Sequence, residues 1–119
     1  MSYLALATRQ FEAMAEFYAS RLGFPVLRGW DRPNSRGCLL DLNGLKLEIL
    51  DAARERAPLE LGPLGDRVHL VIEVEDVDAA YGNLAIDAPP PVTTSWGTRM
   101  FALRDPDGTP VHYLQWTNE

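Results

Sequence analysis

The fold is decided by two stretches of sequence, NGLKLEIL at residues 43–50 and DGTPVHYL at residues 107–114. Each begins with a polar residue followed by glycine, the pair typical of a tight turn between strands. Each continues as a strand, and the fourth residue after the glycine is Glu48 in the first stretch and His112 in the second. This match predicts an internal repeat of two similar modules.

The residues before the first stretch predict a complete β-α-β-β-β module. Residues 3–7 alternate as a short strand. A helix follows, because apolar residues recur at helical spacing up to Gly23, which supplies the stop; these residues are Phe11, Met14, Ala15, Tyr18 and Leu22. Residues 25–30, 37–42 and 45–50 read as strands, with a turn-rich segment at 31–36 between the first two.

The same pattern restarts after a charged connection rich in proline and glycine. Residues 68–74 read as a strand, Asp76 as the N-cap of a helix reaching Leu84, and residues 91–94, 98–104 and 111–116 as strands. We therefore predict one α+β domain over residues 1–119, with module one at 1–54, a linker at 55–66 and module two at 67–119. The two βαβββ modules should form a curled, partly open eight-stranded sheet around a cleft, with the helices outside.

Composition excludes several classes of function. The chain is 46% hydrophobic, enough for a core, and its formal charge of −6 with scattered basic residues argues against a nucleic-acid partner. No apolar stretch approaches the roughly 18 residues that cross a bilayer. The single cysteine, Cys38, cannot form an internal disulfide and is expected to be a buried, inert thiol. With no signal segment at the N-terminus, we expect a cytoplasmic protein.

Strand alternation places a candidate metal site on the inner face of the sheet. Tyr3, Glu48 and His69 fall opposite the apolar positions of their strands, and His112 shares a face with Leu114 and Trp116. Two imidazoles and a carboxylate suit a divalent ion such as Fe(II), Mn, Ni or Zn, with open positions for a substrate. Without metal, the same side chains would form an ordinary buried hydrogen-bonded cluster, or Glu48 would pair with Lys46 on the surface.

Aromatic residues and one cation are candidates for lining a ligand cleft. Aromatic rings combined with a cationic group suit a small organic ligand; the residues are Trp96, Arg99, Phe101 and Trp116. The alternative for each of them is ordinary core packing.

These motifs together resemble the vicinal oxygen chelate superfamily, also called the glyoxalase, bleomycin-resistance and dioxygenase group. The resemblance covers almost the whole chain and is carried by Phe17-Tyr18, Leu22-Gly23-Phe24, the Leu45–Leu50 segment, the His69 strand with Asp76-Val77-Asp78-Ala79-Ala80, and Trp96-Gly97-Thr98-Arg99 leading to Asp105-Pro106-Asp107-Gly108. It implies the βαβββ fold and a homodimer, but one such fold hosts many reactions.

The resemblance also implies roles for four residues. Metal-dependent members similar to glyoxalase I have metal positions that correspond to Tyr3, Glu48, His69 and His112. Tyr3 stands where a histidine is expected and His112 where a glutamate is expected, which argues against a lactoylglutathione lyase. In this chain Tyr3 would be a fourth ligand or a proton donor. Extradiol dioxygenases have longer chains and a terminal carboxylate on the last strand, where this chain has His112, which argues against that activity.

Three functions follow as competing hypotheses. The first is a metal-dependent enzyme in which Glu48, His69 and His112 hold the ion while it stabilises an oxyanion of a small substrate with vicinal oxygens, in isomerase, lyase or dioxygenase chemistry. The second is a metal-free protein of the bleomycin-resistance type that binds a small molecule or antibiotic. The third is a partner domain without a small ligand, which the polar inner face disfavours.

Overall fold

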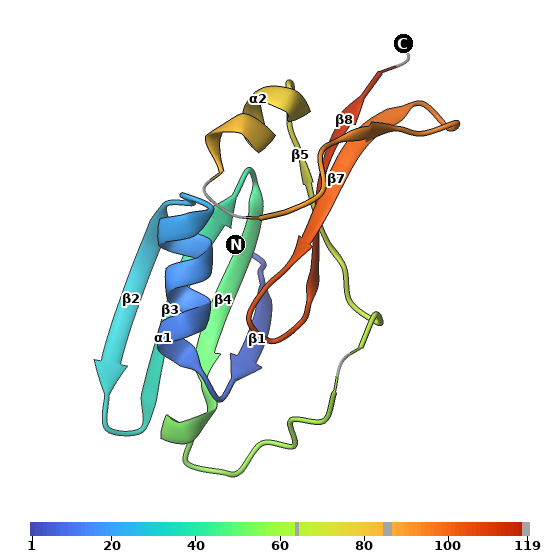
Figure 1. Ribbon diagram of the computed structural model, residues 1–119. Coiled ribbons are helices and arrows are strands. Elements are labelled where there is room, and N and C mark those ends of the chain that lie inside the picture. Colours follow the sequence, from blue (N-terminus) through green and yellow to red (C-terminus); the bar gives the residue numbers. More distant parts are fainter. Residues whose placement is uncertain (64, 85–86, 118–119) are drawn as a thin grey trace. The chain divides into compact units, whose positions relative to one another are not determined.

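Two four-stranded mixed sheets organise the chain in a computed structural model, which describes residues 1–63, 65–84 and 87–117 (Figure 1). The chain divides into two compact units, Met1–Pro63 and Leu64–Glu119. The first contains β1 (Leu4–Thr8), α1 (Phe11–Glu16), a π-helical turn (Phe17–Arg21), β2 (Val26–Arg32), β3 (Ser35–Leu42), β4 (Leu45–Asp51) and a 3₁₀ turn (Ala52–Arg54). The second contains β5 (Leu70–Glu73), α2 (Val77–Asn83), β6 (Val92–Thr93), β7 (Thr98–Arg104) and β8 (Pro110–Trp116).

The predicted repeat is confirmed down to the register of the strands. Sheet A has the order β1-β4-β3-β2 and sheet B the order β5-β8-β7-β6, with one parallel pair at the corresponding place in each. Leu4 pairs with Leu47, and Leu70 pairs with Val111. Each partner is the third residue after its turn glycine, so the two turns set the same register in both modules. No helix in the described part of the chain has the length and apolar character needed to cross a membrane.

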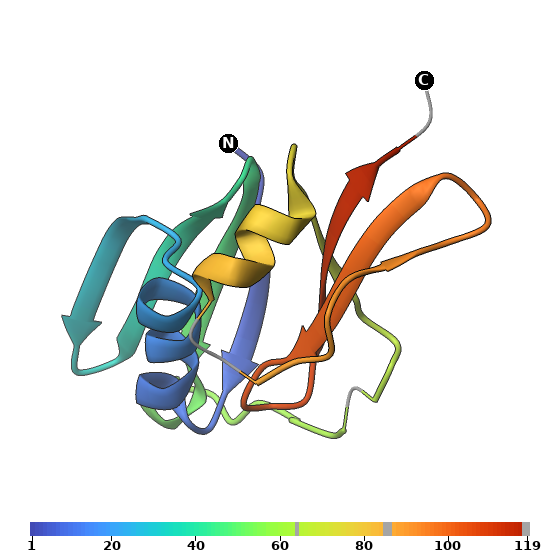
Figure 2. The ribbon, with the colours of Figure 1, turned by 45° about the horizontal axis from the view of Figure 1, so that its top comes forward.

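Helix α1 covers one face of sheet A, as Figures 1 and 2 both show. Of the predicted apolar stripe, Met14, Tyr18 and Leu22 are buried, whereas Phe11 and Ala15 are partly exposed. The helix contacts β4, in which the alternate residues Leu47 and Ile49 are buried. The π-helical turn that continues α1 ends at Arg21, and Gly23 follows with a φ of +78°, a left-handed conformation that glycine adopts without steric cost. We call the side of each sheet away from its own helix its far face.

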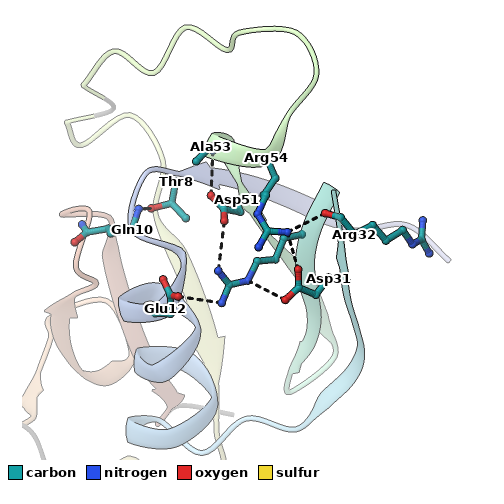
Figure 3. A network of polar contacts seen from close by, with 9 residues as sticks. Thr8, Gln10, Glu12, Asp31, Arg32, Asp51, Ala53 and Arg54 are labelled. Carbon is teal, nitrogen blue, oxygen red and sulfur yellow. Dashed lines mark hydrogen bonds and ion pairs between the residues drawn. The ribbon is translucent and has the colours of Figure 1, made fainter. Parts of the chain in front are cut away.

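A cluster of charges fixes the helix against the ends of the strands (Figure 3). The guanidinium of Arg36 lies 3.1 Å from Glu12 Oε2 and 3.7 Å from Asp51 Oδ2, and it covers the Phe11 ring at 4.5 Å. Arg54 pairs with Asp31 at 2.6 Å. Because Asp51 is buried, its pairing with Arg36 offsets the cost of removing that carboxylate from water. This network is structural and uses none of the predicted site residues.

The single thiol lies on the α1 side of sheet A. Cys38 pairs with Ile49 across the strands and is 7% exposed, and burial raises the pKa of its thiol. Since the thiolate is the reactive form, we predict that Cys38 in folded protein reacts with a disulfide reagent at pH 8 at least about 100-fold more slowly than in denaturant. Equal rates in the two conditions, followed by absorbance, would contradict this burial.

Helix α2 covers one face of sheet B. Asp76 caps it as predicted, accepting a hydrogen bond from the Ala79 amide at 3.1 Å, and the Val77 amide donates to Gln115 Oε1 at 2.8 Å. Beneath it Phe101 stacks on Tyr113 at 4.8 Å, and burial raises the pKa of Tyr113 to about 12. The face covered by α2 is therefore aromatic core.

The turn between β7 and β8 is held by one buried carboxylate. Asp105 Oδ1 accepts hydrogen bonds from the amides of Asp107 and Thr109, both at 2.9 Å. This carboxylate keeps the start of β8, which carries His112, in a fixed place relative to the end of β7.

Candidate functional site

Two histidines meet on the far face of sheet B. His69 directly precedes β5, and His112 lies in the middle of β8. Because Val71 pairs with His112, the two histidines are diagonal neighbours on one face of the parallel pair. Their rings stack with centroids 5.0 Å apart, and His69 Nδ1 lies 2.8 Å from His112 Nε2. The structure thus brings together two of the four residues predicted for the site.

The second ring nitrogen of His69 also has a partner. His69 Nε2 lies 2.8 Å from the main-chain oxygen of Asp66. A carbonyl oxygen only accepts, so Nε2 carries the proton and Nδ1 presents a lone pair in the neutral ring. His112 Nε2 then donates to His69 Nδ1, which assigns both tautomers from their partners.

His112 is less exposed than His69, and one of its two ring nitrogens, Nδ1, is buried. Nδ1 of His112 is buried without a hydrogen bond from any described residue. Burial lowers the pKa of His112, and the charges of His69 and Arg104 lower it further. The lowered pKa favours the neutral form of His112, the form in which imidazole binds a metal.

The pair would supply two nitrogen ligands to a divalent ion only after the hydrogen bond between the rings is broken. A ligating histidine usually donates its other N–H to a carbonyl or carboxylate, as His69 does to Asp66. Two nitrogens on a tetrahedral ion are about 3.4 Å apart, so the 2.8 Å separation would have to widen by about 0.6 Å. Ligation through His112 Nε2 would place a proton on its unpartnered Nδ1, which lowers the affinity.

The far face around the histidines is apolar and ends in two indoles. Val71 and Trp116 are 46% and 52% exposed, and Leu114 lies between His112 and Trp116 along β8. Trp96, 55% exposed, meets Trp116 edge-to-face at 5.9 Å, and Trp116 Nε1 donates to Glu73 Oε2 at 3.1 Å. Imidazole, apolar and aromatic groups thus follow one another along this face.

Two predicted lining residues lie on the other face of sheet B. Arg99 forms a bidentate pair with Asp78 of α2 at 2.9 and 3.0 Å, and its Nη1 donates to Thr93 at 3.1 Å. Phe101 is buried between Tyr113 and Tyr81. Along β7, Arg99 and Phe101 alternate with the residues that lie on the far face, so we do not include them in the proposed site.

Glu48 and Tyr3 belong to the first unit, so their grouping with the histidines stays a prediction. Within the described residues, no three His, Cys, Asp or Glu side chains are grouped as metal ligands. Glu48 is on the far face of sheet A, where the row across the strands runs Arg28, Leu39, Glu48 and Ala5. Burial raises the pKa of Glu48, although the Arg28 charge acts in the opposite direction. Tyr3 directly precedes β1 and is half exposed.

The comparisons with known proteins agree with this fold. A family model described as the Glyoxalase/Bleomycin resistance protein/Dioxygenase superfamily matches residues 1–113. The chain belongs to this superfamily. The fold expected from the resemblance is thereby confirmed, whereas the superfamily spans many activities and leaves the reaction open.

Solved structures resemble this chain over nearly its whole length. A glyoxalase/bleomycin resistance protein/dioxygenase from Nocardioides is 27% identical, with a TM-score of 0.76 over 98% of this chain and 83% of that one. A glyoxalase family protein from Enterococcus faecalis is 31% identical, with a TM-score of 0.66 over 96% and 95%. TnmS3, an antibiotic binding protein from Streptomyces sp. CB03234, shares the fold at 22% identity, with a TM-score of 0.65 and 98% of each chain covered. Among curated proteins, none matches the chain.

Two contacts in this superfamily member could not be predicted from its sequence, one beside His69 and one in sheet A. Asp66 was assigned to the linker, yet its carbonyl accepts from His69 and its carboxylate pairs with Arg104 at 3.0 Å. Trp30 was read only as a strand end, yet its ring lies against Gly37 on the far face of sheet A. No local motif marks either contact, because both depend on which strands become neighbours.

Glu48 should lower the stability of this superfamily member at neutral pH. Its pKa is raised in the folded state, so ionisation costs stability above its unfolded pKa of about 4.3, and the cost vanishes below that pH. We predict that Glu48→Gln raises the free energy of unfolding at pH 7 by less than about 1 kcal/mol and leaves it unchanged near pH 3.5. Chemical denaturation at both pH values checks this, and a loss of stability at pH 7 would contradict it.

Proposed function

We propose that this protein is a metal-dependent member of the superfamily in which His69 and His112 hold a divalent ion that binds a small, oxygen-bearing substrate. The observation that carries the proposal is the approach of His69 Nδ1 and His112 Nε2 to 2.8 Å on the far face of sheet B. The neutral state of His112 supports it, because a protonated imidazole cannot bind a metal.

The protein side chains would share the remaining tasks. A bound ion would supply Lewis acidity, polarising a substrate oxygen and stabilising negative charge on it. His69 and His112 would hold it, with Glu48 as the predicted carboxylate ligand and Tyr3 as the predicted fourth ligand or proton donor. The apolar far face at Val71 and Leu114 would bind the carbon part of the substrate and exclude water from it.

Metal content tests the proposal. Untagged protein should be purified after reconstitution with Fe(II), Mn, Ni or Zn and analysed for metals, beside the double variant His69→Gln/His112→Gln. We expect near-stoichiometric metal in the wild type and a trace in the double variant. No metal with any of the four ions in the wild type, or equal metal in both proteins, would refute the proposal.

A second candidate function is metal-free binding of an aromatic or cationic ligand. The half-exposed indoles of Trp96 and Trp116, together with Glu73, favour it, because indole faces and a carboxylate attract such ligands. The fold similarity to an antibiotic binding protein is compatible with it. Ligand quenching of tryptophan fluorescence that is unchanged by metal removal, and lost in Trp116→Ala, would support this function over the first.

We also propose that the protein is a homodimer, as the superfamily resemblance implies. Analytical ultracentrifugation should give twice the 13.3 kDa mass of the chain at micromolar concentration. A monomer at all concentrations up to 100-fold above that used for metal binding would exclude the dimer.

A further inference from the structure

The far-face histidine pair is tied to a second, exposed set of groups at the start of the second unit. Asp66 presents its main-chain oxygen to His69 Nε2 and its carboxylate to Arg104. Arg104 is the last residue of β7, and its Nη1 also donates to the carbonyl of Gly108 at 2.8 Å. One guanidinium therefore holds Asp66 to the turn that precedes β8.

The turn that receives Asp66 is itself well fixed. Asp105 holds it through two amide hydrogen bonds at 2.9 Å, and Arg104 pairs with Pro110 across the two strands. The same hairpin carries His112 two residues beyond Pro110. His112 and the partner of His69 are thus both positioned by the β7–β8 hairpin, one directly and the other through Asp66.

The hydrogen bond to Asp66 determines which nitrogen of His69 has a lone pair available to bind a metal ion. With the proton on Nε2, the Nδ1 lone pair faces His112 Nε2 at 2.8 Å. With the proton on Nδ1, that nitrogen would be a donor and could not bind a metal ion. An outer partner that fixes a histidine tautomer typically changes metal affinity by about 10–100-fold.

We propose that Arg104 and Asp66 are positioning residues that fix the Nε2–H tautomer of His69 and so make its Nδ1 a ligand nitrogen. The part concerning the metal depends on the proposed function, whereas the tautomer does not. The ion pair joins two exposed residues, with side chains 56% and 66% accessible, and such pairs contribute little to stability. Its effect is therefore on the position of the Asp66 carbonyl.

The tautomer is measured first, in metal-free protein labelled with ¹⁵N-histidine. The chain has only two histidines, so a His112→Gln sample assigns the spectrum. At pH 8.5 we expect about 90% of His69 as the Nε2–H form, because the Asp66 carbonyl oxygen accepts a hydrogen bond from Nε2. A His69 that is mainly Nδ1–H would overturn the proposal, whatever the protein does with metals.

The positioning role is measured with Arg104→Gln. We expect the Nδ1–H fraction of His69 to rise at least threefold and the zinc dissociation constant, from calorimetry, to rise about threefold to tenfold. Arg104→Lys, which keeps the charge beside Asp66, should recover part of both effects. The matched control is Arg54→Gln, which removes an equally charged residue from the Asp31 ion pair of the first unit and should change neither quantity.

The outcomes separate the two proposals. If Arg104→Gln behaves like Arg54→Gln in both measurements while remaining folded, Arg104 has no positioning role. If the wild type shows the Nε2–H tautomer and Arg104→Gln shifts it, but zinc binds to neither protein, the positioning of His69 stands and the proposed metal site fails.

Discussion

Gly37→Ala is expected to destabilise the protein by about 2–3 kcal/mol, as overpacking of a tight site does. A Cβ at residue 37 would lie 2.5 Å from Cζ2 of the Trp30 indole and 2.9 Å from the Ile49 carbonyl oxygen. The indole could move only by giving up its hydrogen bond to Ser35 Oγ at 2.9 Å, and the carbonyl belongs to the central strand β4. Urea denaturation measures the loss.

Gly29→Ala is the matched control for that variant. Gly29 lies on β2, paired with Cys38 next to Gly37, and a Cβ there would meet only the Gly37 oxygen at 3.8 Å, an ordinary contact. We expect its stability to change by less than about 1 kcal/mol. The double variant Trp30→Ala/Gly37→Ala should be less destabilised than the sum of its single changes, because the ring clash is absent. Equal stabilities of Gly37→Ala and Gly29→Ala would show that Trp30 does not rest on Gly37.

His69→Gln and His112→Gln are each expected to weaken binding of Zn(II) by at least about 100-fold. Loss of a group that only hydrogen-bonds a metal ligand lowers metal affinity by about 10–100-fold, and loss of the ligand itself should cost more. Glutamine keeps much of the volume of the ring and removes the basic nitrogen that faces the other histidine. Isothermal titration on metal-free protein at pH 7.5 measures the affinity.

Stability separates loss of the site from loss of the fold. Because His69 is exposed, we expect the free energy of unfolding of His69→Gln to lie within about 0.5 kcal/mol of the wild-type value. Glu60→Gln, which removes an exposed carboxylate from the connection between the sheets, is the control and should keep full affinity. Zinc binding that survives in both histidine variants would contradict the site, because the ion would then have other ligands.

Much of the fold was predictable from local chemistry. The turns at Gly44 and Gly108 set the strand register, and the apolar stripe that ends at Gly23 specified the first helix. The strand near residues 91–94 is confirmed as β6, reduced to Val92–Thr93. The first hairpin differs, because the predicted turn at 31–36 is mostly strand: β2 runs to Arg32 and β3 starts at Ser35, where cross-strand pairing outweighs turn propensity.

The candidate site was only partly predictable. Strand alternation put His69 and His112 on one face of sheet B, as the structure has them. Alternation within β7 also separates Arg99 and Phe101 from that face, and composition alone had grouped them with the tryptophans. The support from Asp66 and Arg104 comes from chain segments brought together by pairing of β5, β7 and β8, and no sequence pattern marks it.

In the proposed site, His69 Nδ1 and His112 Nε2 bind the same metal ion. X-ray absorption of protein loaded with one equivalent of Zn(II) tests it most directly, because imidazole rings give a characteristic outer-shell scattering pattern. We expect two imidazole ligands per zinc in the wild type, and one in His69→Gln loaded with excess zinc. A wild-type spectrum without imidazole scattering, or a protein that takes up no zinc, would contradict it.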